Sequence, residues 1–595
     1  MALLIDPRRG DIEDDASSTK LWSLASLAAW VLVEVSLPKL ILSWLLLIVL
    51  PCLLLGAAPL AVTAWLSTFS RHAVDVFSGL APMLAFTGLL ALAAFGGRPA
   101  FRLAERSFWS LNALAVQPSF VLCREAMRHF VGRRLSVYFR RDGQRVGQVT
   151  AIAAALLMSL VSGAAAWAAW PHSRWIGSWG DVAEPFTLLV AAFANSVVLF
   201  GAYVACGSLA WGAADAAMGQ PTGLGGYDPD PGPDAKVWRV AHLSDLHTVG
   251  ERFGFRIESG RSGPQGNARL ERTMEALARV HEAEPLDLVL VSGDMTDAGR
   301  SSEWAEFLVA LEALAPSLRD RMLFLPGNHD VNVVDRANPA RLDLPFSPGK
   351  RLRQLRALAI LAGLQGERVF VPDTAGRPKS TLSAWLAPYA SAMSSFVRTG
   401  RGKRVSAIRA LWDEAFPMAL PPEIPGGLGV ILLNSNADTH FSFTNALGLI
   451  PAEQERRLAA IVKAQPETCW LVALHHHPVE YPRATRSLSE RIGTALINGS
   501  WFLRQLKPAA GRIVVLHGHR HVDWTGRCGP LRIVSAPSPV MGEPYFYVQR
   551  FVSASGRLAL LKPQRVDLER NASAIEASRP APAWAEARDE RVKEA

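Results

Sequence analysis

LVLVSGDMTD, residues 288–297, joins an apolar run of strand length to a short polar turn. The run 288–291 predicts a buried β-strand, and the Ser-Gly turn after it presents Asp294 and Asp297. Acidic side chains just beyond a buried strand point toward solvent or a ligand rather than into the core. A single turn of this kind is also common on protein surfaces, because Asp and Gly are ordinary turn residues. Its meaning therefore depends on whether other strands end in the same way.

Four more strand-like runs after residue 236 also end in side chains that bind metal ions. Helical patterns separate most of these runs, which predicts an α/β domain with a central, largely buried sheet. Ligands of open α/β sheets bind at the carboxyl ends of the strands, which is where these turns fall. The five turns are DLH at 245–247, GDMTD at 293–297, GNHD at 327–330, HHHP at 475–478 and GHRH at 518–521. Carboxylate, imidazole and amide groups without thiolates suit Mn, Fe, Zn or a mixed pair of these ions.

The first third of the chain has the composition of a membrane domain. The 595 residues are too many for one core, and 50% are hydrophobic while 19% are charged. The apolar excess lies before residue 212, in runs near the length of about 20 residues that crosses a hydrocarbon core. After a polar N-terminal segment at 1–20, the predicted all-α transmembrane domain at 21–211 has about four spans, near 40–65, 77–95, 146–170 and 186–211. Residues 21–37 fit either a further span or an interfacial helix.

Charge in the loops predicts the orientation of these spans. The loop 98–145 contains ten Arg and three acidic residues, whereas the loop 171–185 contains a single Arg, Arg174, and no Lys. Loops rich in Lys and Arg stay in the cytoplasm, so both 98–145 and the region after residue 211 are expected there. This loop also explains much of the net charge of +9, so a lipid bilayer is the expected partner and nucleic acid is not. The five scattered cysteines, without CxxC spacing, predict free thiols in a reducing compartment.

The rest of the chain divides into a linker, one large domain and a tail. The Gly/Pro/Asp-rich residues 212–236 predict a flexible linker, residues 237–563 the α/β domain, and the polar residues 564–595 a disordered tail. A helical insertion at about 331–425 interrupts the domain and carries 14 Lys and Arg against 7 Asp and Glu. This basic insertion fits either a solvated helical segment or a cap that faces an anionic substrate or a membrane surface.

In order and spacing, the five turns resemble the signature blocks of calcineurin-like metallophosphoesterases. They are most similar to the branch of bacterial class III cyclic-nucleotide phosphodiesterases, and GLIPAEQERRLAAIV at 448–462 resembles the helix before the histidine block of that branch. The resemblance covers about 237–563. It implies a calcineurin-like metallophosphoesterase sandwich, in which two central β-sheets are flanked by helices. With the predicted spans, it implies an integral protein of the bacterial inner membrane whose catalytic domain is cytoplasmic.

The resemblance also implies a centre of two divalent metal ions, Mn, Fe or Zn. Its ligands would be Asp245, His247, Asp294 and His521 for one ion, and Asp294, Asn328, His476 and His519 for the other. Asp294 would therefore bridge the two ions. His476 is assigned because the ligand of this family usually lies two residues before the proline of the histidine block. The same assignment has His475 pointing back toward the strand and His477 pointing toward the substrate.

The expected catalytic residues are His329 and Asp330 of the GNHD turn. The resemblance implies that His329 stabilises the charge of the phosphate or protonates the leaving oxygen, and that Asp330 orients His329. Asp297 would support a metal ligand from behind. The implied reaction is attack of a metal-bridging hydroxide on phosphorus in a phosphodiester or phosphomonoester.

The sequence leaves the substrate, a phosphate-ester small molecule or lipid, open between three classes. They are a cyclic nucleotide, a nucleotide or sugar pyrophosphate, and a lipid phosphate or pyrophosphate at the membrane face. A catalytically silent membrane scaffold or sensor is the alternative from another functional class. That alternative predicts missing ligands, and the five turns lack none.

Overall fold

The structure is a computed structural model of the whole chain. It describes residues 49–77, 116–134, 143–232, 235–251, 253–257, 263–334, 348–393, 405–439, 442–481, 496–554 and 556–568, with a few isolated residues between these ranges. The predicted N-terminal segment, residues 21–37, almost all of the predicted span at 77–95 and residues 569–595 lie outside the described residues. The five cysteines are free, as predicted.

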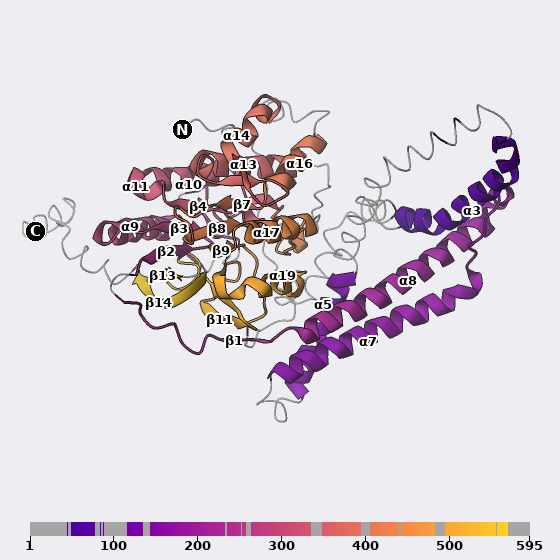
Figure 1. Cartoon of the computed structure of the whole chain (residues 1–595), viewed down its shortest axis with the longest axis horizontal. Helices are drawn as coiled ribbons and strands as arrows, with labels where there is room; N and C mark the ends of the chain where they lie inside the picture. The colour runs from indigo at the N-terminus through magenta and orange to yellow at the C-terminus, as the bar shows by residue number, and fades with distance from the viewer. Residues whose placement is uncertain are drawn as a thin grey trace, which may run out of the picture.

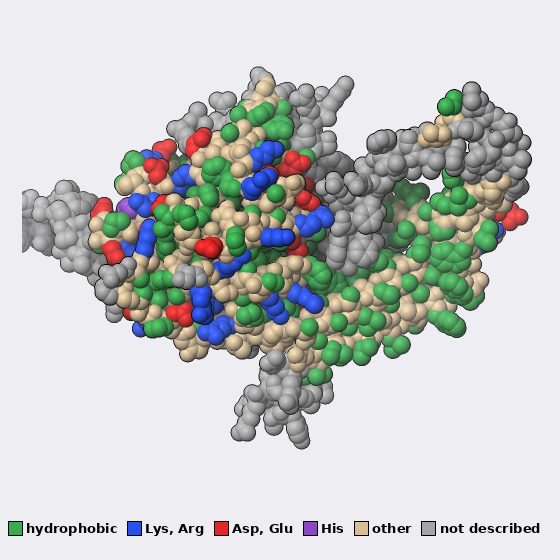
Figure 2. All heavy atoms as spheres, in the orientation of Figure 1, with side chains coloured by type: hydrophobic (Ala, Val, Ile, Leu, Met, Phe, Trp, Pro, Cys, Tyr) green, Lys and Arg blue, Asp and Glu red, His purple; other side chains and the backbone are tan. Residues whose placement is uncertain are grey.

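Three described helices are long and apolar enough to cross a membrane: α3 (Leu50–Phe77), α7 (Gly143–Ala169) and α8 (Pro185–Ala217). Helices α7 and α8 lie side by side, and α3 packs against α8 (Figure 1). Glycines allow this close approach, because a Cβ on Gly212 would lie 2.3 Å from Ala155 Cβ and one on Gly201 would lie 2.7 Å from the carbonyl oxygen of Ser162. Hydrophobic side chains cover the visible outer faces of α7 and α8, whereas charged side chains are scattered over the other domain (Figure 2).

The predicted Arg-rich loop contains a helix, α5 (Gln117–Arg134), which packs against α7 and the end of α8. At this end of the apolar helices, Trp211 of α8 contacts Trp501 of α19 (Gly499–Leu506), with ring centroids 6.2 Å apart. Arg124 of α5 forms ion pairs with Glu125 and with Asp215 of α8. The apolar helices therefore pack directly against the α/β domain.

The interpretation of 212–236 as a flexible linker is wrong for much of its length. Helix α8 continues to Ala217, and β1 (Pro221–Gly223) pairs antiparallel with β11 (Trp524–Cys528). The Asp228 carboxylate then accepts hydrogen bonds from Arg532 and from the backbone N–H of Leu560. A Gly/Pro-rich segment can still satisfy the free edge of a sheet, because an edge strand needs only a few backbone hydrogen bonds.

The α/β domain contains two sheets flanked by helices, as predicted. The large sheet has the order β1-β11-β12-β10-β9-β8-β7-β5-β6, and the small sheet has the order β14-β13-β2-β3-β4. The large sheet consists of β1, β5 (Phe370–Pro372), β6 (Pro378–Thr381), β7 (Met418–Leu420), β8 (Leu428–Leu432), β9 (Cys469–Ala473), β10 (Ile513–His517), β11 and β12 (Leu531–Ser535). The small sheet consists of β2 (Val237–Leu243), β3 (Leu288–Val291), β4 (Met322–Phe324), β13 (Tyr545–Ala554) and β14 (Arg557–Asp567).

Two core clusters hold the layers together. The first contains side chains from both sheets and from α9 (Ala268–Ala283), α10 (Ser301–Glu312) and α13 (Pro348–Gln365). The second lies between the large sheet and helices α17 (Ala452–Ala464) and α19. Successive residues of β9 and β10 alternate between the two clusters, as a strand buried on both faces requires.

The predicted helical insertion at about 331–425 also contributes strands. Helices α13, α14 (Leu382–Leu386) and α16 (Val405–Ala415) lie within it, but β5, β6 and β7 extend the edge of the large sheet. These strands have three or four residues each, which is too short for a period-2 pattern to appear in the sequence. At the other end of the domain, β14 continues to Asp567, so residues 564–567 of the predicted disordered tail belong to a strand.

Candidate metal centre

All five metal-binding turns follow the strands that the sequence associates with them. DLH follows β2, GDMTD follows β3, and GNHD follows β4 and begins the short helix α12 (Asn328–Val331). HHHP follows β9 and GHRH overlaps the end of β10. Because β2, β3 and β4 are parallel to one another, as are β9 and β10, the turns gather at the carboxyl ends of the two sheets.

Backbone conformation distinguishes these turns from the rest of the described chain. Five described residues other than glycine have positive φ: Asp245 (56°), His247 (43°), Asp294 (52°), His519 (76°) and His521 (53°). Residues with a Cβ avoid this region at a cost of about 1 kcal/mol or more, and such conformations concentrate at functional sites. Every one of the five is a predicted metal ligand. The fold therefore maintains strained backbone at the positions where the sequence predicts ligands.

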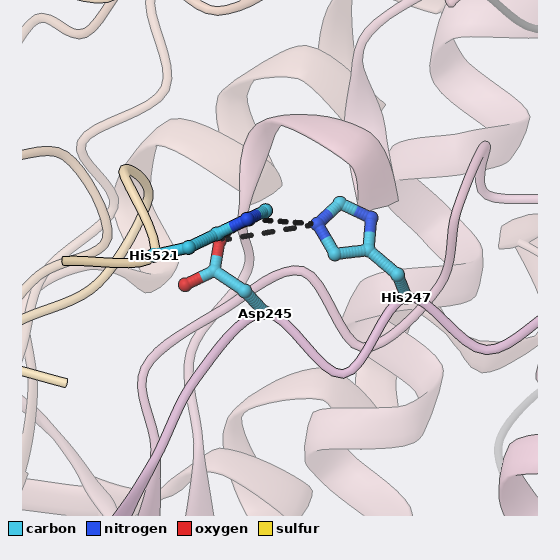
Figure 3. Close-up of side chains that lie close together, drawn as sticks. All are labelled: Asp245, His247 and His521. Carbon is cyan, nitrogen blue, oxygen red and sulfur yellow. Dashed lines mark hydrogen bonds and ion pairs between the residues drawn. The ribbon is translucent and has the colours of Figure 1, made fainter. Parts of the chain in front are cut away.

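The first half of the centre consists of Asp245, His247 and His521 (Figure 3). His521 Nε2 lies 3.2 Å from Asp245 Oδ1 and 3.3 Å from His247 Nε2. His247 Nε2 lies 4.0 Å from the same carboxylate oxygen. Three donor atoms from two separate turns thus converge on one point, as the ligands of a single ion would.

Asp294 joins this half to the second. Its Oδ2 lies 3.8 Å from His247 Nε2 and 3.1 Å from His475 Nε2. Its Oδ1 accepts a hydrogen bond of 2.8 Å from the backbone N–H of His329. Asp294 also occurs in two of the three candidate metal-binding groups, one with His247 and the other with His475. This is the position of a bridging carboxylate.

The second half consists of Asp294, Asn328, His475 and His519. His475 Nε2 lies 3.1 Å from Asn328 Oδ1 and 3.1 Å from His519 Nδ1. Its other ring nitrogen, Nδ1, lies 2.8 Å from the carbonyl oxygen of Ser292, which orients Nε2 toward the remaining donors. All four side chains are buried.

The structure brings His475, rather than the predicted ligand His476, within 3.1 Å of Asp294 and Asn328, so His475 is the candidate ligand here. The assignment of His476 stays a prediction, because its Nε2 is buried without a hydrogen-bond partner among the described residues. His476 Nδ1 lies 2.9 Å from Ser435 Oγ, and its ring packs so closely on Gly448 that a Cβ there would lie 2.5 Å from the imidazole. Strand phase explains the difference. In β9, Leu471 and Ala473 face the core between the sheets, and His475 continues that face two residues later. The period of the strand therefore favours His475, whereas the distance to the proline favours His476.

His477 lies beside the centre without joining it. Its Nε2 lies 3.2 Å from Glu480 Oε1, and its ring stacks with those of Tyr481 and His519 at centroid distances of 5.9 Å. Glu480 also accepts a hydrogen bond of 3.0 Å from Arg520. The prediction that His477 points toward the substrate stays a prediction.

Of the two predicted catalytic residues, His329 lies at the centre. Its ring centroid is 4.6 Å from that of His247, and it forms a candidate metal-binding group with His247 and Asp294. His329 Nδ1 lies 2.6 Å from the carbonyl oxygen of Asp297, so this carbonyl fixes the orientation of the ring. The side chain of Asp297 orients a second histidine, because its Oδ1 lies 3.0 Å from His247 Nδ1.

The prediction that Asp330 orients His329 is wrong. The Asp330 carboxylate accepts hydrogen bonds from the backbone N–H of Gly327 at 2.8 Å and from both the N–H and the hydroxyl of Thr296, at 2.9 and 2.7 Å. These contacts tie the GNHD turn to the GDMTD turn. Burial and the nearby Asp294 charge raise the pKa of Asp330 to about 6. Asp330 therefore supports the two turns, while the Asp297 carbonyl orients the His329 ring.

The electrostatics of the centre match those of a site for cations. Burial opposes the ionisation of Asp294, but the neighbouring His475 and His329 keep the pKa of its carboxyl below the usual range. Burial also disfavours the His475 cation, yet Asp294 raises the pKa of His475 to about 9. A proton on His475 thus balances the bridging carboxylate, and a bound ion would replace that proton. Two carboxylates, four imidazoles and one amide converging in this way fit two divalent ions.

Comparisons with known proteins found one matching family model and several similar solved structures. Residues 239–389 match the family model described as calcineurin-like phosphoesterase. No curated protein matches the chain. A dimetal phosphatase from Danio rerio aligns with 56% of this chain and 99% of its own at 10% identity, with a TM-score of 0.31. The calcineurin-like phosphoesterase YfkN from Bacillus subtilis aligns with 57% of this chain and 92% of its own at 13% identity, with a TM-score of 0.30.

Proposed function

We propose that this chain, whose residues 239–389 belong to the calcineurin-like phosphoesterase family, hydrolyses a phosphodiester such as a cyclic nucleotide at the cytoplasmic face of a membrane. The domain is a metal-dependent phosphoester hydrolase. The observation that carries the proposal is the convergence of seven donor residues around Asp294, with His329 beside them. Proteins that only bind a phosphate do not need two complete sets of metal ligands.

Two sets of residues would each hold one metal ion. Asp245, His247 and His521 would hold one ion, and Asn328, His475 and His519 the other, with Asp294 shared. Two divalent ions bound there would supply a nucleophile derived from water at neutral pH and would neutralise the charge on the phosphate oxygens. Water has no access to most of these side chains, so their charges act in a medium of low dielectric constant.

His329 is the residue placed to act on the leaving group. Its Nδ1 lies 2.6 Å from the Asp297 carbonyl oxygen, and this contact directs Nε2 toward the place where the phosphate would bind between the ions. A protonated Nε2 would donate to the leaving oxygen as the ester bond breaks. A diester has an alkoxide leaving group of high basicity, which benefits most from such a donor.

A lipid phosphate or pyrophosphate is the second candidate substrate, and the position of α13 favours it. Lys350, Arg351, Arg353 and Arg356 lie in the first turns of this helix, and Arg353 donates to the carbonyl oxygen of Val331 directly after the GNHD turn. Positive charge beside the metal centre would assist the binding of a second phosphate group. Membrane helices that pack against the domain would keep the enzyme near such a lipid.

The substrate assignment is tested with the full chain in detergent micelles, reconstituted with Mn²⁺ or Fe²⁺. We expect turnover of bis-p-nitrophenyl phosphate and cyclic AMP that exceeds turnover of p-nitrophenyl phosphate and of a lipid pyrophosphate. A preference for the lipid would replace the first candidate by the second. Hydrolysis of none of these substrates with either ion would contradict the enzymatic proposal.

Membrane anchoring is tested separately. The apolar α3, α7 and α8 support it, and so does the excess of Arg in the loop 98–145. We expect the chain to remain in the membrane pellet after alkaline washing and the α/β domain to be cleaved by protease only in vesicles that expose the cytoplasmic face. Release by alkali, or cleavage from the opposite face, would contradict the proposed location.

A further inference from the structure

Arg256 lies fully buried between the DLH turn and helix α9. Its guanidinium donates hydrogen bonds to three backbone carbonyl oxygens: from Nε to His247 at 2.7 Å, from NH1 to Pro264 at 3.0 Å and from NH2 to Gly266 at 2.7 Å. Burial lowers the pKa of Arg256 to about 10, so the side chain keeps its charge at neutral pH. A buried arginine whose donors meet carbonyl groups of a loop fixes the path of that loop.

The loop that Arg256 closes is also tied at its two ends. The Asn267 side chain accepts a hydrogen bond from the backbone N–H of Val249 at 3.0 Å and donates one to the Val249 carbonyl at 2.8 Å. The N–H of Gly266 donates to the carbonyl of Gly254 at 2.9 Å. Hydrogen bonds therefore fix the backbone on both sides of Arg256, and its contact with His247 is part of this ordered, buried structure.

His247 is held from two directions by this segment. Arg256 binds its carbonyl oxygen, while the backbone N–H of the next residue, Ile257, donates to Asp297 Oδ2 at 2.8 Å. Asp297 Oδ1 in turn lies 3.0 Å from His247 Nδ1. His247 also has a φ of 43°, a conformation that a residue with a Cβ leaves readily unless its peptide groups are restrained.

We propose that Arg256 is a positioning residue for the first half of the metal centre. Through the His247 carbonyl it keeps the His247 ring where Asp245 and His521 converge. Arg256 donates hydrogen bonds to residues 247, 264, 266 and 267, which lie outside the second half. Loss of the guanidinium should therefore weaken the binding of one ion and leave the other in place.

The test uses the full chain in detergent micelles, stripped of metal and titrated with Mn²⁺ by calorimetry and electron paramagnetic resonance. The variants are R256Q and R256K. The matched control is R272Q, because Arg272 is an exposed arginine on α9, the helix that follows this segment. For R256Q we expect one ion to bind at least about tenfold more weakly, as is usual for residues that support a ligand, and the other to bind as in the parent. R256K should be intermediate, because a lysine ammonium can reach one of the three carbonyls.

Unchanged affinity for both ions in R256Q, or equal weakening of both, would overturn the proposal. If R256Q shows no cooperative thermal unfolding, R256K is used in its place. If R256K then binds both ions with the affinities of the parent, the result counts against the proposal. R272Q should bind both ions as the parent does. If R272Q lost affinity for one ion by the same factor as R256Q, the proposal would also be overturned, because the loss of affinity would then not depend on the contact with His247.

Discussion

The two halves of the metal centre are held by different parts of the fold. In the first half, Asp245, His247 and His521 all have left-handed backbone conformations on loops, and the side chain of His521 is 14% exposed. In the second half, Asn328 and His475 have ordinary conformations, whereas His519 also has a positive φ of 76°. Asn328, His475 and His519 are at most 1% exposed, as are Asp245 and His247. The first half therefore depends more on restrained left-handed backbone, and it contains the partly exposed ligand His521. We expect the first ion to exchange more readily than the second.

Removal of the shared ligand should have the largest effect, because Asp294 contacts both halves. We expect Asp294→Asn to lose both ions, as measured by metal analysis of the purified protein, and to lose detectable turnover. Asp287→Asn is a matched control, since Asp287 precedes the same strand at its opposite end. Retention of two ions by the Asp294 variant would show that the halves are independent.

The second half is tested by comparing two adjacent histidines. We expect His475→Ala to lose one ion together with most activity, because His475 Nε2 lies within 3.1 Å of Asp294 Oδ2 and Asn328 Oδ1. His476→Ala should keep two ions, because its imidazole lies against Ser435 and Gly448. Metal content and turnover of both variants would be measured side by side. The opposite pattern would restore His476 as the ligand.

His329→Ala should separate chemistry from metal binding. We expect two bound ions and a turnover reduced about 10²- to 10⁴-fold, the usual contribution of one general acid. The deficit should be larger for cyclic AMP than for bis-p-nitrophenyl phosphate, because p-nitrophenolate leaves without a proton. Equal deficits for the two substrates would assign His329 to charge stabilisation rather than to proton transfer.

The smallest effect is expected at Glu455, away from the metal ligands. Burial raises the pKa of Glu455 on α17 to about 8 from 4.5, and Asn498 donates to its carboxylate at 3.1 Å. Between those two values the folded protein binds more protons than the unfolded chain, so stability falls as pH rises, by at most about 1.4 kcal/mol per pH unit. We expect the thermal midpoint of the parent to fall between pH 6 and pH 8 by more than that of Glu455→Gln. Parallel pH profiles would contradict this assignment.

The order of the turns and the two-sheet fold could be predicted because strand periodicity and ligand types are local features of the sequence. The run 288–291, for example, forms β3 with the predicted limits. Features set by tertiary contacts could not be predicted. The group that orients His329 is a backbone carbonyl, an acceptor that the residue type does not reveal, and the strands of the insertion pair only once the large sheet exists. For the histidine block, strand phase favours His475 over His476.

An anomalous difference map from crystals of the Mn²⁺-loaded protein tests the dinuclear centre most directly. The account predicts two peaks, one among Asp245, His247 and His521 and the other among Asn328, His475 and His519, with Asp294 contacting both. A single peak, or a second peak coordinated by His476 instead of His475, would contradict it.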